Sequence, residues 1–303
     1  MPIPAAARPT VLTPNVIGVL WMLLATTLLT GMFVVAKHLM ATLPILEVGL
    51  FRFLMALAFY IPWLIKHGVA PLRTKRHFSH FWRAFFGATS LFCGIYAVHY
   101  LRLADAVVLT FTIPLWSIIF AALFLGERVR LRRSLATVAG FIGVVLVVRP
   151  HMGIEPAALV ALLAAILATG AIATMKSLTR TEPTDRIVFY FLAYGTLILG
   201  MPALFVLEMP TLVEWGWLLL LGFFGSAGQV CLTRAYAAGE MTVIAPFDFT
   251  RIIIAGILGY LLFDELPDGW AFAGAAIILA SCAYIVHREA MLRKRSAVAG
   301  PSV

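Results

Sequence analysis

The chain has 303 residues, of which 62% are hydrophobic and only 12% are charged, and its mean hydropathy is +0.98. A soluble domain carries about 25% charged residues, so this composition excludes a soluble protein. It indicates a chain that crosses the membrane several times.

The first 15 residues contain four prolines and no apolar period, and they are predicted to form a disordered tail. A membrane-spanning helix needs about 20 mostly apolar residues. Ten stretches approach or reach this length, and the connections between them are too short for a soluble domain. We therefore predict an all-α integral membrane protein, with residues 290–303 as a C-terminal tail. The ten predicted spans are residues 16–37, 45–65, 81–101, 105–125, 134–149, 156–175, 187–207, 214–234, 242–263 and 269–287.

The three cysteines, Cys93, Cys231 and Cys282, lie inside apolar stretches. They form no CxxC pair, and no His stands at metal-ligand spacing from them. They are interpreted as small core residues, and the sequence predicts no metal and no cofactor.

Lys and Arg are distributed very unevenly between the two sides of the predicted spans. Of the 23 basic residues, 18 fall on one side, with Arg83 among them, and three fall on the other. Arg52 and Arg251 lie within spans. Because basic loops stay in the cytoplasm, both termini are predicted to be cytoplasmic, in the inner membrane. Basic loops of this kind face anionic lipid, so the net charge of +9 does not indicate a nucleic-acid partner.

An internal repeat appears when residues 85–127 are aligned without a gap on residues 223–265, an offset of 138. Ten of the 43 aligned positions are identical, including Phe111 with Phe249. Repeats of this kind are a frequent architecture of secondary transporters.

Each repeat would contain five spans, and an odd number means that the second repeat enters the membrane upside down. We predict two inverted five-helix repeats, residues 16–150 and 151–289. Glu127 and Glu265 are equivalent in this alignment and end their spans. They are predicted to accept hydrogen bonds from neighbouring helix ends rather than to contact substrate.

Two related motifs carry a family resemblance. ADAVVLTFTIPLWSIIFAALFLGERVRLRRSLATVAGFIGVVLVVRP occupies residues 104–150, and GYLLFDELPDGWAFAGAAIILA occupies residues 259–280. With Lys37 at the end of the first span and Arg52 in the second, the chain resembles EamA-type members of the drug/metabolite transporter superfamily. One departure is Asp264, where the first half has a glycine of a Gly-Glu pair.

The resemblance implies ten helices, a substrate cavity between the two repeats, and alternating access. Relatives of this type include exporters of amino acids, aromatic ones among them, and uptake carriers for S-adenosylmethionine. The resemblance leaves the substrate and the direction of transport open.

Several polar residues inside the predicted spans are candidates for the substrate cavity. Asp248 and Arg251 are three residues apart on one helical face. They either attract the ammonium and carboxylate groups of a substrate, or form an internal ion pair that fixes helix packing. Arg52 either contacts substrate or braces a helix interface, and the amide of Gln229 needs a partner in a cavity or on a neighbouring helix.

Aromatic residues with polar tips, Tyr96, Trp116 and Tyr194, suit a cavity for a small amphipathic solute, although each alone fits helix packing equally well. His99 and Tyr100 are interpreted as a gate or as part of the interfacial aromatic belt. Pro114 and Pro246 permit kinks in two spans that the repeat pairs with each other. They do not occupy equivalent positions, so the kinks are expected at different depths.

The sequence therefore predicts a secondary transporter that exports amino acids, with uptake of a metabolite such as S-adenosylmethionine as the alternative. No nucleotide-binding loop is present. Protons are candidates for coupling, with Asp248 as the carboxylate placed deepest in a span. An integral-membrane enzyme is disfavoured, because the seven His residues are scattered and only His77 and His80 share a face, at what is predicted to be a wetted interface. The partners expected are a small molecule and the lipid bilayer, and the protein is either a monomer or a homodimer.

Overall fold

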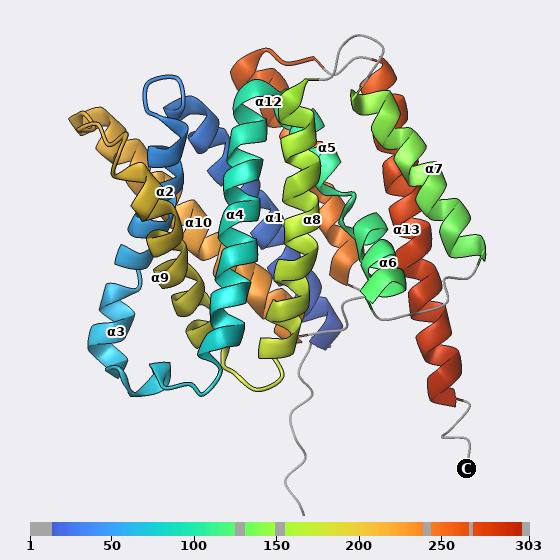
Figure 1. The fold of residues 1–303 in the computed structure, drawn as a ribbon, viewed down its shortest axis with the longest axis horizontal. Helices are drawn as coiled ribbons and strands as arrows, with labels where there is room; N and C mark the ends of the chain where they lie inside the picture. The colour runs from blue at the N-terminus through green and yellow to red at the C-terminus, as the bar shows by residue number, and fades with distance from the viewer. Residues whose placement is uncertain (1–13, 125–130, 149–154, 239–243, 267–268, 299–303) are drawn as a thin grey trace, which may run out of the picture.

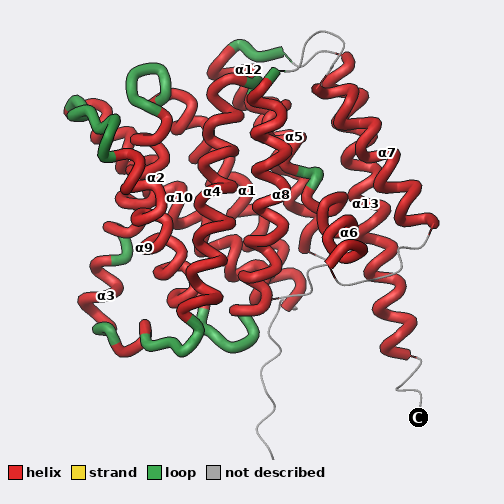
Figure 2. The backbone as a smooth tube through the Cα atoms, in the orientation of Figure 1, coloured by secondary structure: helices red, strands yellow, loops and turns green. Residues whose placement is uncertain are grey.

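The computed structural model describes residues 14–124, 131–148, 155–238, 244–266 and 269–298. All regular structure in these residues is helical (Figures 1 and 2). The helices are α1 (Pro14–Leu39), α2 (Ile45–Ala58), α3 (Ile61–His67), η1 (Ala70–Leu72), α4 (His77–Tyr100), α5 (Leu103–Thr110), α6 (Ile113–Phe124), α7 (Leu131–Val148), α8 (Pro156–Leu178), α9 (Thr184–Ala203), α10 (Leu212–Ala238), η3 (Ala245–Phe249), α12 (Thr250–Phe263) and α13 (Gly269–Val298).

Each of the ten predicted spans coincides with one helix or with two consecutive ones. The second span contains α2 and α3, the fourth contains α5 and α6, and the ninth contains η3 and α12. Seven helical segments among the described residues are long and apolar enough to cross a membrane, and α7 and α13 contain shorter apolar stretches. The predicted all-α membrane fold is confirmed.

Lipid-facing and buried surfaces follow from the sequence pattern. On α7, Leu135, Val138, Ile142 and Val145 recur at helical spacing and are all more than half exposed, as expected of side chains that contact lipid. Hydroxyls within spans are satisfied by the preceding turn: the Thr30 hydroxyl, for example, donates to the backbone carbonyl of Thr26 at 2.7 Å.

For each large contact between two helices, the equivalent helices of the other half of the chain are also in contact. α1 packs along α10, and its equivalent α8 packs along α4; α2 also packs on α10, and α9 packs on α4. The remaining large contacts, α2 with α9, α7 with α13 and α5 with α12, join equivalent elements. α4 and α10 run in opposite directions (Figure 1). A two-fold relation between the halves produces this pattern, which supports the predicted repeat.

The fourth and ninth spans are interrupted at equivalent positions. α5 ends before Phe111 and Thr112, and η3 gives way to α12 between Phe249 and Thr250. In both places the threonine hydroxyl donates to the carbonyl three residues earlier, at 2.8 and 2.7 Å. The two equivalent rings, Phe111 and Phe249, contact each other with centroids 5.2 Å apart.

This result differs from the expectation that the kinks lie at different depths. Pro114 follows the first break within α6, whereas Pro246 precedes the second within η3. A proline lacks the amide hydrogen of the helical bond to the carbonyl four residues earlier, so it weakens the turn that precedes it. The break at Phe111 and Thr112 precedes Pro114 and is explained in this way, whereas the change from η3 to α12 follows Pro246 and is not.

The connection from α3 to α4 is tied to the connection from α8 to α9. Thr74 donates to the Glu182 carboxylate at 2.7 Å, and Arg186 forms an ion pair with it at 2.5 Å. Partial burial acts to raise the pKa of Glu182, but these hydrogen bonds outweigh it and hold the pKa below the ordinary value of 4.5.

Candidate functional site

Arg52 is buried in the centre of the bundle. Its side chain extends from α2 and is only 1% exposed. The Nη2 atom donates to the backbone carbonyl of Gly225 on α10 at 3.3 Å, and Nε donates to the sulfur of Met32 at 3.4 Å. The guanidinium carbon lies 4.5 Å from the centroid of the Phe53 ring, and Nη1 has no hydrogen-bond partner.

A second buried arginine, Arg83 on α4, lies against the same group of side chains. It is 5% exposed, and its guanidinium carbon is 4.3 Å from the centroid of the Phe191 ring. The Arg52 guanidinium carbon lies 5.6 Å from that ring, so the two cations share one aromatic neighbour. Nη2 of Arg83 lies 3.8 Å from the sulfur of Met175, and Nε has no partner.

The assignment of Arg83 to a cytoplasmic loop is therefore wrong. α4 begins at His77, so Arg83 stands in its second turn and faces the interior. Sequence analysis missed it because a cation near the end of an apolar stretch is normally a topology signal. Gly87 lies four residues after Arg83, one helical turn further along α4. This spacing is the sequence signal that places Arg83 on the inward face of the helix.

Two glycines make room for the arginines. A Cβ atom on Gly225 would lie 3.0 Å from Nε of Arg52, and a Cβ atom on Gly87 would lie 2.2 Å from Nη1 of Arg83. These glycines are equivalent in the repeat. The same offset of 138 relates Phe53 to Phe191, whose rings contact each other edge to face at 5.2 Å.

Asp248 and Arg251 form an ion pair with each other, at 2.8 Å between Oδ1 and Nη2. Both are partly buried, with side chains 23% and 15% exposed. Thr250, between them, lies 3.3 Å from the hydroxyl of Thr26 on α1. The geometry agrees with the internal ion pair that the sequence allowed, and a role in transport stays a prediction.

A second ion pair joins the two halves of the chain at one end of the bundle. The Lys37 ammonium contacts the Glu265 carboxylate and donates to the carbonyl of Leu101 at 2.8 Å. The other oxygen of Glu265 accepts from the backbone amide of Leu103, the first residue of α5, at 2.7 Å. We call the group formed by Lys37, Glu265 and this amide the latch. It agrees with the prediction that Glu265 binds a neighbouring helix end, while Glu127 lies outside the described residues.

Asp264 holds Glu265 in place. Its φ of 54° is left-handed, a conformation that glycine and, less often, aspartate adopt. The turn directs the Glu265 amide back to the carbonyl of Gly259 at 3.1 Å. Asp264 and the glycine of the family motif can both meet this backbone requirement, which accounts for the departure noted in the sequence.

The other predicted site residues lie in separate neighbourhoods. Trp116 donates to the hydroxyl of Thr112 at 3.1 Å and its ring packs on α7, whereas Tyr194 stacks on Tyr190 beside α4. Buried Gln229 lies on α10. Tyr96 and His99 both pack on Tyr100, which is 53% exposed, near the end of α4. These contacts do not join the predicted residues into one cavity.

His80 also differs from expectation. It was predicted at a wetted interface, but it is fully buried with its ring 4.7 Å from that of Tyr190. It packs on the inner face of α4, three residues before Arg83.

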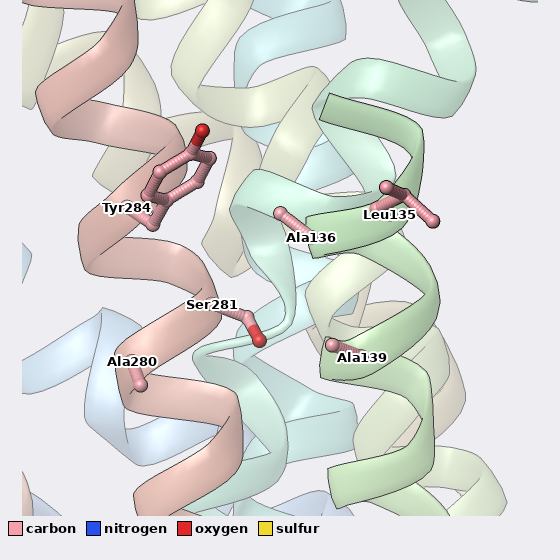
Figure 3. Close-up of a pocket in the computed structure, with 6 residues that line it drawn as sticks. All are labelled: Leu135, Ala136, Ala139, Ala280, Ser281 and Tyr284. Carbon is pink, nitrogen blue, oxygen red and sulfur yellow. The ribbon is translucent and has the colours of Figure 1, made fainter. Parts of the chain in front are cut away.

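A shallow groove lies between α7 and α13, away from the buried arginines and both ion pairs. None of the predicted site residues lines it. Figure 3 shows its six lining residues, Leu135, Ala136, Ala139, Ala280, Ser281 and Tyr284.

Comparison with known proteins identifies the fold. The model of the EamA-like transporter family matches the chain twice, at residues 16–149 and 155–287. The chain belongs to this family. The two matches cover consecutive halves with the same family pattern, close to the predicted repeats.

Similar proteins of this family carry several substrate names. The S-adenosylmethionine uptake transporter of Rickettsia bellii is 32% identical over 278 residues, covering 90% of this chain and 94% of the relative. The pseudopaline exporter of Pseudomonas aeruginosa is 34% identical over 270 residues, covering 88% and 94%. The riboflavin transporter of Rhizobium johnstonii is 33% identical over 284 residues, covering 92% and 94%.

A solved crystal structure has the same fold, with a TM-score of 0.62 at 19% sequence identity. The match covers 88% of this chain and 95% of that one. This EamA-type protein is thus a multi-pass member of a transporter family, and the three relatives above are named for different substrates, one for uptake and one for export.

Proposed function

We propose that this protein is a secondary transporter that exports amino acids, aromatic ones included, by alternating access across the cytoplasmic membrane. The observation that carries the proposal is the latch, in which side chains link α1 and the start of α5 to the end of α12. A contact of this kind can open without unfolding either half. Exposure of a central site to one face at a time requires such a contact.

The proposed moving parts are two inverted repeats, residues 16–150 and 151–289. The equivalent helix–helix contacts in the two halves, such as α1 with α10 and α8 with α4, support this division into repeats. Moving Arg83 into a span leaves 17 basic residues on one side against three on the other, which still favours cytoplasmic termini. Because α1 then begins in the cytoplasm, the latch closes the external face.

Uptake of S-adenosylmethionine is the second candidate function, and the similarity to uptake transporters for that compound favours it. Amino acids and S-adenosylmethionine share an α-amino-carboxylate group. Under either candidate function, the substrate would bring an α-amino-carboxylate group into the helix bundle. Direction depends on gradients and coupling.

Coupling to protons through Asp248 faces an obstacle. Arg251 lies 2.8 Å from its carboxylate and already occupies it as an ion-pair partner. A role for Asp248 as a proton carrier therefore requires the pair to separate during the transport cycle, and exchange or facilitated transport avoids this step.

Counterflow in proteoliposomes tests the proposal. Purified protein is reconstituted in vesicles loaded with one unlabelled amino acid, and entry of labelled amino acids and S-adenosylmethionine is followed with and without a pH gradient. We expect saturable counterflow of at least one amino acid and none in protein-free vesicles. Flux of S-adenosylmethionine alone would favour the second candidate, and absence of flux for the whole panel would refute both.

A further inference from the structure

We propose that Arg52 and Arg83 together form the anion-binding part of the substrate site, and that it binds the carboxylate of the transported metabolite. This assignment rests on the proposed transport function and specifies its substrate class. In this proposal the substrate carboxylate binds the two guanidinium groups beside Phe191 rather than the Asp248–Arg251 pair.

Burial of the two cations is energetically unfavourable. Removing a charged group from water destabilises the fold unless the group is paired. Arg52 and Arg83 are almost fully buried, and in the described part of the chain neither forms a salt bridge. Their partners are one carbonyl, two thioether sulfurs and aromatic faces. Such contacts compensate only partly, because a cation–π contact is weaker than the ion pair that a buried charge requires.

No acidic group in the described part of the chain forms a salt bridge with either cation. Asp248 pairs with Arg251, and Glu265 belongs to the latch. Glu47, on the same helix as Arg52, accepts the backbone amide of Glu208 at 3.1 Å with Oε2, and its Oε1 is buried without a hydrogen-bond partner. The elements that contact the two guanidinium groups present Met32, Met175, two phenylalanine rings and the carbonyl of Gly225.

Each of the two guanidinium groups keeps one free hydrogen-bond donor. Nη1 of Arg52 and Nε of Arg83 are buried without hydrogen-bond partners, and both guanidinium groups lie against Phe191. Two separate donors match the two oxygens of a carboxylate. The surrounding rings and thioethers suit the apolar part of an amino acid.

Two glycines leave space in the helices for the arginine side chains. Alanine at Gly87 or Gly225 would place a Cβ atom 2.2 or 3.0 Å from a guanidinium nitrogen. The glycines are equivalent in the repeat, but the arginines are not. Tyr190 and Leu221 stand at the positions equivalent to Arg52 and Arg83. The scaffold is thus duplicated, whereas both charges come from the first half.

Ligand binding to purified protein tests the assignment independently of flux. The probes are L-phenylalanine, L-phenylalaninamide, which replaces the carboxylate with a neutral amide, and S-adenosylmethionine. We expect at least one carboxylate probe to raise the Tm of the wild-type protein, and the amide to bind more weakly than phenylalanine by at least about tenfold.

The variants are Arg52→Met and Arg83→Met, which keep apolar bulk but remove the charge. Because an uncompensated buried charge is lost, each variant should retain or exceed the wild-type Tm without ligand while losing the carboxylate-dependent shift. Arg180→Met, at an exposed arginine after α8, is the matched control and should behave as wild type. A purely structural role predicts the reverse, a lower Tm with ligand discrimination unchanged.

Three results would overturn the assignment. They are equal binding of phenylalanine and its amide, no Tm shift with any carboxylate probe, or a full shift in both Met variants. Counterflow separates this failure from that of the proposed function. Equal flux of the acid and the amide refutes the carboxylate site but leaves transport intact. Absence of flux refutes transport, and a carboxylate-dependent Tm shift lost in the Met variants still supports the site.

Discussion

Replacement of Glu265 by glutamine should open the latch. The carboxylate accepts from Lys37 and from the amide of Leu103, and the Lys37 and Glu265 side chains are only 13% and 16% exposed. Glutamine fits the same space but is neutral. Its amide nitrogen cannot accept a hydrogen bond, so one of the two charge-assisted bonds, each contributing about 1.5–3 kcal/mol, is lost. The other falls toward the value of about 1 kcal/mol for a neutral bond.

The total loss is about 2–5 kcal/mol, which corresponds to roughly a 30- to 5,000-fold shift away from the latched state. A cysteine at Ala104, which is only 9% exposed in the first turn of α5, reports this shift. We expect a membrane-impermeant maleimide to label Ala104→Cys faster, by a factor in this range, when Glu265→Gln is also present.

Glu155→Gln is the matched control, because it makes the same substitution at an exposed position before α8 on the same predicted face. Lys37→Met should raise the labelling rate as well, and combining it with Glu265→Gln should add little. The latch would be refuted as a gate if Glu265→Gln labelled no faster than the parent, or if Glu155→Gln had an equal effect.

Three further predictions concern packing, charge and pH. Gly222→Ala places a Cβ atom 2.3 Å from Cβ of Met55 and 2.9 Å from its carbonyl carbon, so thermal unfolding should show a loss of about 1–3 kcal/mol, whereas Gly216→Ala, with no atom within 4 Å, should be neutral. Asp248→Asn and Arg251→Ala should insert normally but lose counterflow, because each leaves its partly buried partner unpaired; full flux in both would make the pair purely structural. The folded-state pKa of Glu182 is lowered, so its stabilising contribution is complete above the ordinary value of 4.5 and disappears as the pH falls through the folded-state value. The Tm difference between wild type and Glu182→Gln should therefore shrink at acid pH, and a difference independent of pH would contradict this prediction.

Hydropathy was sufficient to predict the ten helical units. The offset of 138 indicated which helices of the two halves correspond to each other. The same offset contained more than the sequence analysis used, because it relates Phe53 to Phe191, which proved to be in contact. Breaks within spans were harder to place. Pro114 marks the break in the turn before it, because that turn loses the bond of the missing amide, whereas the change from η3 to α12 follows Pro246 and has no such signal in the sequence.

The site residues were predicted less well, since their partners come from distant parts of the chain. Arg83 looked like a loop residue because its burial depends on α8 and α9, which sequence position alone does not bring beside α4. Trp116 and Tyr194 have the chemistry of cavity residues, but the packing of their helices separates them. Asp248 and Arg251 were placed on one face correctly, because that relation depends only on helical spacing.

The latch also bears on the resting energy of the carrier. In the proposed topology the latch closes the external face, so its bonds contribute free energy only to the inward-facing state. A gradient or a difference in substrate affinity that sets the direction of net flow must offset this contribution before the outward-facing state is populated.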